Sequence, residues 1–193
     1  FAVCACSSYA HGYFHGYRRI AERADLDAVI HLGDYIYEYG TGDYGKVRPY
    51  DPPHETLSLK DYRRRYAHYR LDADLQAAHR QHPFIATWDD HETADNAHAA
   101  GASNHSEGSE GPWADRLGAA TQAYREWMPF REQPTVGRLY RSLVYGDLAE
   151  RVVLDTRISG RTEQDAGAPD ARRLLDPEQE AFFAARLAGS TAR

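Results

Sequence analysis

Short apolar runs alternate with segments of helical periodicity along the first half of the chain. The apolar runs at residues 1–5, 28–33 and 84–89 predict strands. The run at 28–33 is nearly continuous, which is typical of a strand buried on both faces of its sheet. Between the strands, apolar positions recur at helical spacing over residues 12–24 and 58–81. The first half of the chain therefore predicts three strands joined by helices.

The second of these helices has a strong start and an aromatic face. Ser58 and Asp61 stand at the spacing of a capping box, in which each side chain bonds the backbone N–H of the other residue. Three tyrosines then recur on one face of the helix: Tyr62, Tyr66 and Tyr69. We interpret this stripe as the face that packs into the core. A loop rich in glycine, proline and tyrosine precedes the helix at residues 39–56.

The rest of the chain predicts two helices and a hairpin. Residues 113–127 have helical periodicity, and residues 138–155 alternate on either side of a turn near 146–147. A last helix is expected to start with Asp176 as its N-cap and Pro177 as its first residue. The resulting order, β-α-β-α-β-α-β-β-α, indicates an α/β fold with a mixed sheet.

Composition narrows the class of protein. A chain of 193 residues with 42% apolar and 27% charged residues is typical of one globular domain. Its net charge of −6 argues against a surface for specific nucleic-acid binding, which would be basic. No apolar run approaches the roughly 20 residues of a membrane helix. The chain also shows no signal peptide and begins and ends within its own pattern, so we expect it to be a piece of a longer protein.

Groups with metal-binding or acid–base chemistry follow each of the three early strands. The first strand leads to Cys6, the second to Asp34, and the third to Asp89, Asp90 and His91. In open α/β sheets, ligands bind in the crevice at the carboxyl ends of the strands. If the three strands are parallel neighbours, these side chains meet at one place.

The residue types at the strand ends indicate a metal centre. Converging buried carboxylates are unfavourable near neutral pH unless a cation holds them. Carboxylates suit calcium, magnesium or manganese, whereas a thiolate such as Cys6 suits iron or zinc. Tyr37 lies close enough to Asp34 for both to reach one ion, and a tyrosine becomes a ligand near neutral pH beside a strong Lewis acid such as ferric iron. The set therefore favours two or more metals of different character.

A cluster of this kind best serves hydrolysis of a phosphate ester. Metal ions lower the pKa of water and hold the attacking and leaving oxygens in line. His91, beside the acidic pair, could protonate the leaving oxygen or hold the phosphoryl group.

Each of these residues taken alone also has a structural interpretation. A Gly-Asp pair after a strand is common, Cys6 alone would be a small core residue, and Asp89 and Asp90 could cap a helix. The coincidence of three strand ends is what favours a site. Two other function classes stay open: a non-catalytic module that binds an ion or ligand, and an oxidoreductase using iron and tyrosine.

Four segments of the chain resemble, in order, the PhoD-type alkaline phosphatases and phosphodiesterases. They are CSSYAHGYFHGYRRIAE, HLGDYIYEYG, TWDDHE and VVLDTR. The resemblance implies a metallophosphoesterase fold similar to that of purple acid phosphatases, an αββα sandwich of two packed sheets flanked by helices. It also implies Fe3+ and Ca2+ as cofactors, a small phosphate ester or phosphodiester as substrate, and a secreted or periplasmic protein exported by the twin-arginine route.

The resemblance carries roles to individual positions. It implies that Cys6 and Tyr37 are iron ligands and that Asp34 bridges iron and calcium. In TWDDHE, Asp90 would bind calcium and His91 would lie beside the phosphate.

The arginine motif of the family is matched only in part. In DTRISGR, Asp155 and Arg157 fit the motif, but Gly160 stands where the family has a tyrosine. The resemblance therefore implies that Arg157 contacts the phosphate or braces the site.

One family motif has no counterpart in this chain. The late GDxH pattern, which supplies further metal ligands, is absent from the sequence. We therefore interpret residues 1–193 as part of a PhoD-like catalytic domain, with no second domain visible. We expect these residues alone to bind metal weakly and to be inactive.

Overall fold

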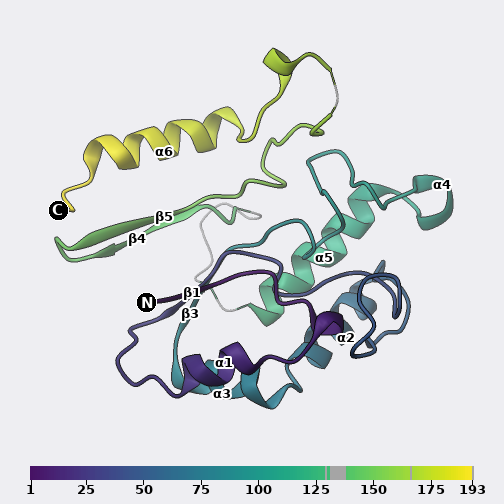
Figure 1. Cartoon of the computed structure of the whole chain (residues 1–193). Helices are drawn as coiled ribbons and strands as arrows, with labels where there is room; N and C mark the ends of the chain where they lie inside the picture. Colours follow the sequence, from purple (N-terminus) through teal and green to yellow (C-terminus); the bar gives the residue numbers. More distant parts are fainter. Residues whose placement is uncertain (129, 131–137, 166, 193) are drawn as a thin grey trace. The chain divides into compact units, whose positions relative to one another are not determined.

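The computed structural model describes residues 1–128, 130, 138–165 and 167–192 (Figure 1). They fall into two compact units, which are described separately. The first comprises Phe1–Asn96 and Ala102–Phe130, and the second comprises Ala97–Gly101 and Arg131–Arg193. The interpretation of residues 1–193 as one partial catalytic domain stays a prediction.

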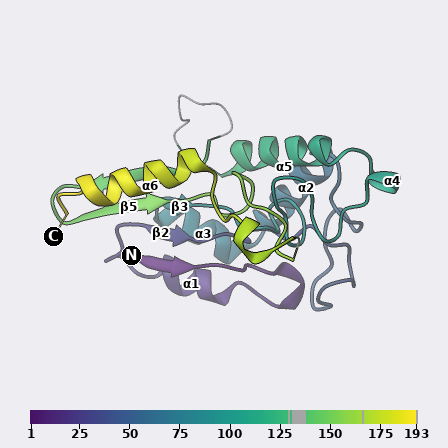
Figure 2. The ribbon, with the colours of Figure 1, turned by 90° about the horizontal axis from the view of Figure 1, so that it is seen from above.

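The first unit is built on a parallel three-stranded sheet with the order β1-β2-β3. The strands are β1 (Ala2–Cys4), β2 (Val29–His31) and β3 (Phe84–Ala86). β2 pairs with both neighbours in parallel, as predicted, so all three strands end at the same edge (Figures 1 and 2). Each strand is shorter than predicted, and the residues beyond it form the loops that carry the candidate site.

Helices cover this sheet in two pairs. α1 (His15–Ala21) lies beside α3 (Ala73–Gln81), and α2 (Leu59–Tyr69) lies beside α5 (Trp113–Trp127) (Figures 1 and 2). Two short elements, η1 (Tyr9–His11) and α4 (Glu107–Glu110), lie in the connecting segments. The α/β class is confirmed.

The capping box and the tyrosine stripe of α2 are confirmed. The Ser58 backbone N–H donates to Asp61 Oδ2 over 3.0 Å, and the Asp61 N–H donates to Ser58 Oγ over 3.3 Å. The three tyrosines of the stripe are fully buried: Tyr62, Tyr66 and Tyr69.

The single helix predicted over residues 58–81 is wrong. It is two helices, because α2 ends at Tyr69 and Asp72 has extended backbone. The Asp72 side chain accepts hydrogen bonds from the N–H groups of Asp74 and Leu75 and so serves as the N-cap of α3. An aspartate side chain competes with the helix backbone in this way, and here it starts a new helix.

The second unit contains the predicted hairpin and the last helix. β4 (Arg141–Tyr145) pairs with β5 (Ala149–Val153) in antiparallel fashion, and Gly146 in the turn has φ 58°. η2 (Pro169–Ala171) precedes α6 (Pro177–Gly189), whose N-cap Asp176 accepts the Gln179 N–H over 2.8 Å. Both predicted elements are confirmed.

One mixed sheet does not form among the described residues. The parallel strands and the hairpin belong to separate sheets. The helical crossovers make β1, β2 and β3 parallel, whereas the tight turn makes β4 and β5 antiparallel partners of each other.

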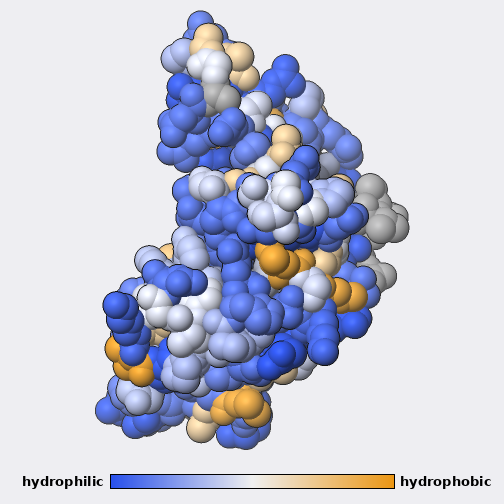
Figure 3. Space-filling view, turned by 90° about the vertical axis from the view of Figure 1, so that its right-hand side faces the viewer, coloured by the Kyte–Doolittle hydropathy of each residue, from blue (hydrophilic) through white to orange (hydrophobic). Residues whose placement is uncertain are grey.

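One face of the protein is largely polar. The face in Figure 3 is mainly hydrophilic, and its hydrophobic residues form small separate patches. Among the described helices, none is both long and apolar enough to cross a membrane.

One buried histidine, His31, and one half-buried histidine, His79, predict that acid destabilises the first unit. Burial lowers the pKa of His31 and of His79 to about 3. The Gly33 N–H donates to His31 Nδ1, which keeps that nitrogen unprotonated. Between pH 6.5 and about 3 the unfolded chain binds protons that the folded chain does not, so the free energy of unfolding falls as the pH falls. The slope is up to about 1.4 kcal/mol per pH unit for each histidine.

Urea denaturation at a series of pH values measures this slope. In the His79→Gln variant, which keeps a polar partner for the Tyr35 hydroxyl, the slope between pH 6 and pH 4 should be shallower than in the wild type. An unchanged slope in that variant would show that His79 does not contribute.

Candidate metal centre

Backbone hydrogen bonds join the loops after β1 and β2 beyond the ends of the strands. The Cys6 N–H donates to the Gly33 carbonyl over 3.1 Å, and the Ser7 N–H donates to the Asp34 carbonyl over 2.8 Å. Cys6 and Asp34 have φ values of 55° and 53°, in the left-handed region that side chains other than glycine rarely adopt. Such strained residues cluster at functional sites, and here both carry candidate ligands.

The loop after β2 also lies against the loop after β3. Gly33 has φ 117°, and a Cβ atom there would lie 2.3 Å from the backbone nitrogen of Asp89. Only glycine permits this approach.

Glu92 ties the same two loops together. Its fully buried carboxylate accepts hydrogen bonds from the N–H groups of Asp34, Tyr35 and Asp89, over 3.0, 2.6 and 2.8 Å. Burial raises the pKa of Glu92 to about 8, and the nearby charge of Asp34 acts in the same direction. The sequence analysis did not assign this residue, although it ends the TWDDHE segment.

Three predicted ligands meet at one oxygen atom. The Cys6 thiol and the Tyr37 hydroxyl each donate to Asp34 Oδ2 over 3.3 Å. Asp34 and Tyr37 are buried, whereas Cys6 is exposed. The geometry therefore gives a thiol, a phenol and a carboxylate one common focus, at the carboxyl end of the sheet.

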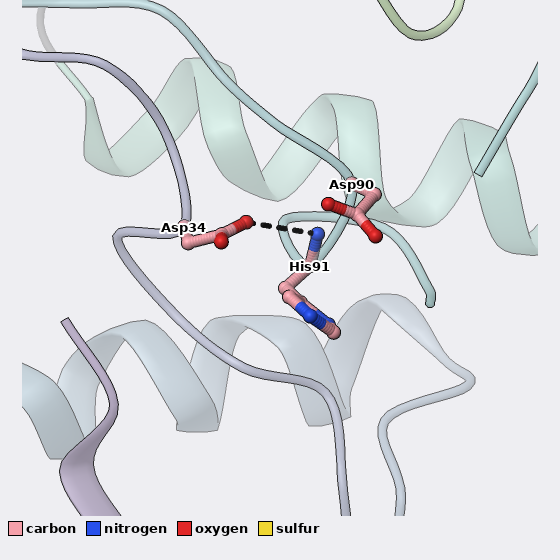
Figure 4. Close-up of side chains that lie close together, drawn as sticks. All are labelled: Asp34, Asp90 and His91. Carbon is pink, nitrogen blue, oxygen red and sulfur yellow. Dashed lines mark hydrogen bonds between the residues drawn. The ribbon is translucent and has the colours of Figure 1, made fainter. Parts of the chain in front are cut away.

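Asp90 and His91 lie beside Asp34 (Figure 4). One potential ligand atom from each of Asp34, Asp90 and His91 lies within 4.8 Å of the others. The backbone N–H of His91 donates to Asp34 Oδ1 over 3.3 Å. The backbone N–H of Asn96 donates to Asp90 Oδ2 over 2.6 Å. Asn96, with φ 53°, is a third left-handed residue beside the centre. The structure thus brings all four predicted metal ligands and His91 together, and their individual roles stay predictions.

Glu38 orients His91 and was missed in the sequence. Its buried carboxylate lies 2.8 Å from His91 Nδ1 and accepts the Asp95 N–H over 2.6 Å. Burial opposes the charged form of His91, but this hydrogen bond and the surrounding carboxylates raise the pKa of His91 to about 9. The surrounding carboxylates therefore favour the protonated imidazole. The available signal was the glutamate that ends the GDYIYE segment.

The pKa shifts of Cys6, Tyr37 and Asp34 are consistent with a site that binds a cation. Burial raises the pKa of the Cys6 thiol, and the hydrogen bond to Asp34 adds to the rise. Burial and the charge of Asp34 raise the pKa of Tyr37. Burial also raises the pKa of Asp34, which the charge of His91 opposes. A cation at their common focus would reverse these shifts, since metal ligands bind in the deprotonated form.

Arg157 belongs to the second unit. Its backbone N–H donates to Asp155 Oδ1 over 3.0 Å. The same carboxylate accepts the backbone N–H groups of Ile158 and Ser159. Asp155 therefore shapes the loop that carries Arg157. The predicted role of Arg157 at the phosphate stays a prediction.

Comparisons with known proteins agree with one another. The family model described as PhoD-like phosphatase matches residues 1–193. Alkaline phosphatase D of Bacillus subtilis (strain 168) is 41% identical over 209 residues, which covers 100% of this chain and 35% of that protein. A solved structure described as "Structure of PhoD" is similar with a TM-score of 0.87 and 40% identity, over 100% of this chain and 39% of the solved chain.

Proposed function

Because this chain belongs to the PhoD-like phosphatase family, we propose that the complete protein hydrolyses phosphate monoesters or diesters at a metal centre focused on Asp34. The observation that carries the proposal is the convergence of Cys6 and Tyr37 on one oxygen of Asp34, with Asp90 and His91 beside it. The chain spans about a third of the length of the curated relative, so the activity is proposed for the whole protein.

The donor set supports iron and calcium as the cofactors. Cys6 and Tyr37 would hold Fe3+, since thiolate and phenolate suit a strong Lewis acid, and Asp34 would bridge to Ca2+. Asp90 would bind Ca2+, which prefers carboxylate oxygens. When bound, the ions activate water and stabilise the negative charge that develops on the phosphoryl group.

His91 would act on the phosphoryl group through Nε2. Because Nδ1 is hydrogen-bonded to Glu38, the ring is held in one orientation and Nε2 is the nitrogen directed to a substrate. A charged imidazole there would donate to a phosphoryl oxygen or protonate the leaving oxygen. Arg157 would contact or brace the same group.

The remaining parts of the proposal concern the whole protein. We propose that the parallel sheet belongs to the αββα sandwich of a metallophosphoesterase and that the protein is exported. We also propose that residues 1–193 alone are inactive, because they cover only 35% and 39% of the two relatives.

The two other function classes receive less support. The family match favours a hydrolase over a non-catalytic ion-binding or ligand-binding module. An open redox site more often uses two histidines and one carboxylate, whereas Cys6, Asp34 and Tyr37 meet here without a histidine in their common contact.

Metal removal tests the proposal with two readouts. The complete gene product should hydrolyse an aryl phosphate or a bis-aryl phosphate and should absorb visible light, because tyrosinate bound to ferric iron is coloured. Chelation should abolish hydrolysis and colour together, and Fe3+ with Ca2+ should restore both. The 193-residue chain serves as a control that should show no enzyme-like turnover.

Each readout has an outcome that contradicts one part of the proposal. An active protein that is colourless and free of iron by elemental analysis would overturn the iron assignment. A coloured protein with its full metal content and no activity on either ester would overturn the proposed reaction.

A further inference from the structure

Aromatic rings gather beside the candidate metal centre, and two of them, His11 and Tyr44, are exposed. The ring centroids of Tyr37 and His91 are 4.3 Å apart, and Tyr44 lies 5.7 Å from Tyr37 and 5.0 Å from Tyr39. The His11 ring meets Tyr44 edge-on at 4.6 Å. Tyr37 is 4% exposed, whereas Tyr44 is 42% exposed. Tyr44 is therefore an outer member of this aromatic cluster and the exposed one that lies against Tyr37.

The backbone beside Tyr44 is held against a buried segment. Gly45 has φ 84°, and a Cβ atom there would lie 2.7 Å from the Ala10 carbonyl oxygen. The same oxygen accepts the Val47 N–H over 2.8 Å, and Ala10 is fully buried. The glycine thus allows the loop to contact Ala10 directly, and this contact fixes the position of Tyr44.

The base of the same loop is fixed as well. The Thr41 N–H donates to the Pro53 carbonyl over 2.7 Å, and the Tyr50 N–H donates to Thr41 Oγ1 over 2.9 Å. Hydrogen bonds on both sides of Tyr44 therefore restrain a loop whose glycine-rich composition would otherwise leave it flexible. A ring that is already ordered loses little conformational entropy when a ligand stacks on it.

The position of Tyr44 relative to His91 suggests what would stack there. Their ring centroids are 6.3 Å apart, with an interplanar angle of 23°. A phosphoryl group held at His91 is bonded to its organic group through an ester oxygen. The organic group of the ester would therefore lie next to the His91 ring. Tyr44 offers a partly exposed ring, nearly parallel to that of His91, at that range.

We propose that Tyr44 is a specificity-determining residue, a platform on which the planar organic group of the ester stacks. The substrate class is then an aryl or nucleobase-bearing phosphate ester or diester rather than an alkyl phosphate. The inference rests on the proposed function for the position of the phosphoryl group. Stacking between two rings changes an equilibrium constant by a few-fold to about tenfold.

Binding of two phosphonates tests the platform without requiring turnover. Phenylphosphonate and methylphosphonate present the same anionic group, but only the first carries a ring. The metal-loaded complete protein should bind phenylphosphonate about three- to tenfold more tightly by calorimetry. Tyr44→Ala should bring the ratio of the two affinities close to one, and Tyr44→Phe should preserve it.

Two further variants distinguish stacking on the Tyr44 ring from the effect of side-chain size and from the effect of where the ring is held. Tyr44→Leu keeps an apolar side chain of similar reach without a ring, so it should lose the preference as Tyr44→Ala does. Gly45→Ala keeps the tyrosine but cannot keep the contact with Ala10, so it should lower the preference as well. General loosening of the site would change both affinities and leave their ratio unaltered.

The outcomes distinguish this inference from the proposed function. A wild-type protein without preference for phenylphosphonate, or a preference that survives in Tyr44→Ala, would overturn the platform. A preference that depends on Tyr44 in a protein that hydrolyses no phosphate ester would support the platform and contradict the proposed reaction.

Discussion

Replacing Asp34 by Asn is expected to abolish phosphoesterase activity and metal retention together. Asp34 Oδ2 accepts hydrogen bonds from the Cys6 thiol and the Tyr37 hydroxyl. Asp34 Oδ1 accepts the backbone N–H of His91. An amide has the same size but lacks the negative charge that a bridging ligand supplies to two cations. A loss of several kcal/mol of transition-state stabilisation corresponds to a fall in kcat/KM of at least about 10³-fold.

Steady-state kinetics and elemental analysis on the complete protein measure both effects. The variant should keep its far-ultraviolet circular dichroism, because Asn fills the same space. Asp25→Asn is a matched control, since Asp25 pairs with Arg23 on the surface of the same unit. Full activity with full metal content in Asp34→Asn would refute the bridging role.

Replacing Glu92 by Ala is expected to produce a large loss of stability. The change removes one buried carboxylate and leaves three backbone N–H groups, of Asp34, Tyr35 and Asp89, without their acceptor. Each unsatisfied buried donor costs about 1–3 kcal/mol, so for three donors the free energy of unfolding should fall by at least about 3 kcal/mol. Activity should fall too, because two loops of the centre lose their common anchor.

Urea denaturation measures the stability change, and Glu92→Gln gives the graded comparison. The Gln side chain keeps one acceptor oxygen but turns an NH₂ group toward backbone donors, so its loss should lie between wild type and Glu92→Ala. Glu126→Ala is a surface control, because Glu126 pairs with Arg63 at an exposed position. Wild-type stability in Glu92→Ala would show that other acceptors replace the carboxylate.

The place of the site could be predicted because it follows from strand direction. The apolar runs before Cys6, Asp34 and Asp90 predicted strands, and helical connections favour parallel neighbours. Parallel neighbours end at one edge, so the convergence followed before any contact was known. The pairing of β2 with β1 and β3 confirms this.

The residues that support the site could not be predicted in the same way. Apart from Asp89, three positions from Glu92, the partners of Glu38 and Glu92 lie 53 to 66 positions away, and most of them are backbone N–H groups, which every residue carries. The two glutamates end the GDYIYE and TWDDHE segments, but a local pattern contains no signal for these distant contacts. The break after α2 was missed for a related reason. Asp72 fits a helical pattern by spacing, but its side chain caps α3 instead.

Convergence across three strand ends has a consequence for how the protein matures. Cys6 reaches Asp34 across 28 positions, and Asp34 reaches His91 across 57, so no short segment assembles the centre by itself. A cation that needs these donors together binds the folded chain and not the unfolded one, and it stabilises the fold by mass action. The supply of that cation during biogenesis would then determine how much folded protein accumulates, as well as how fast each molecule works.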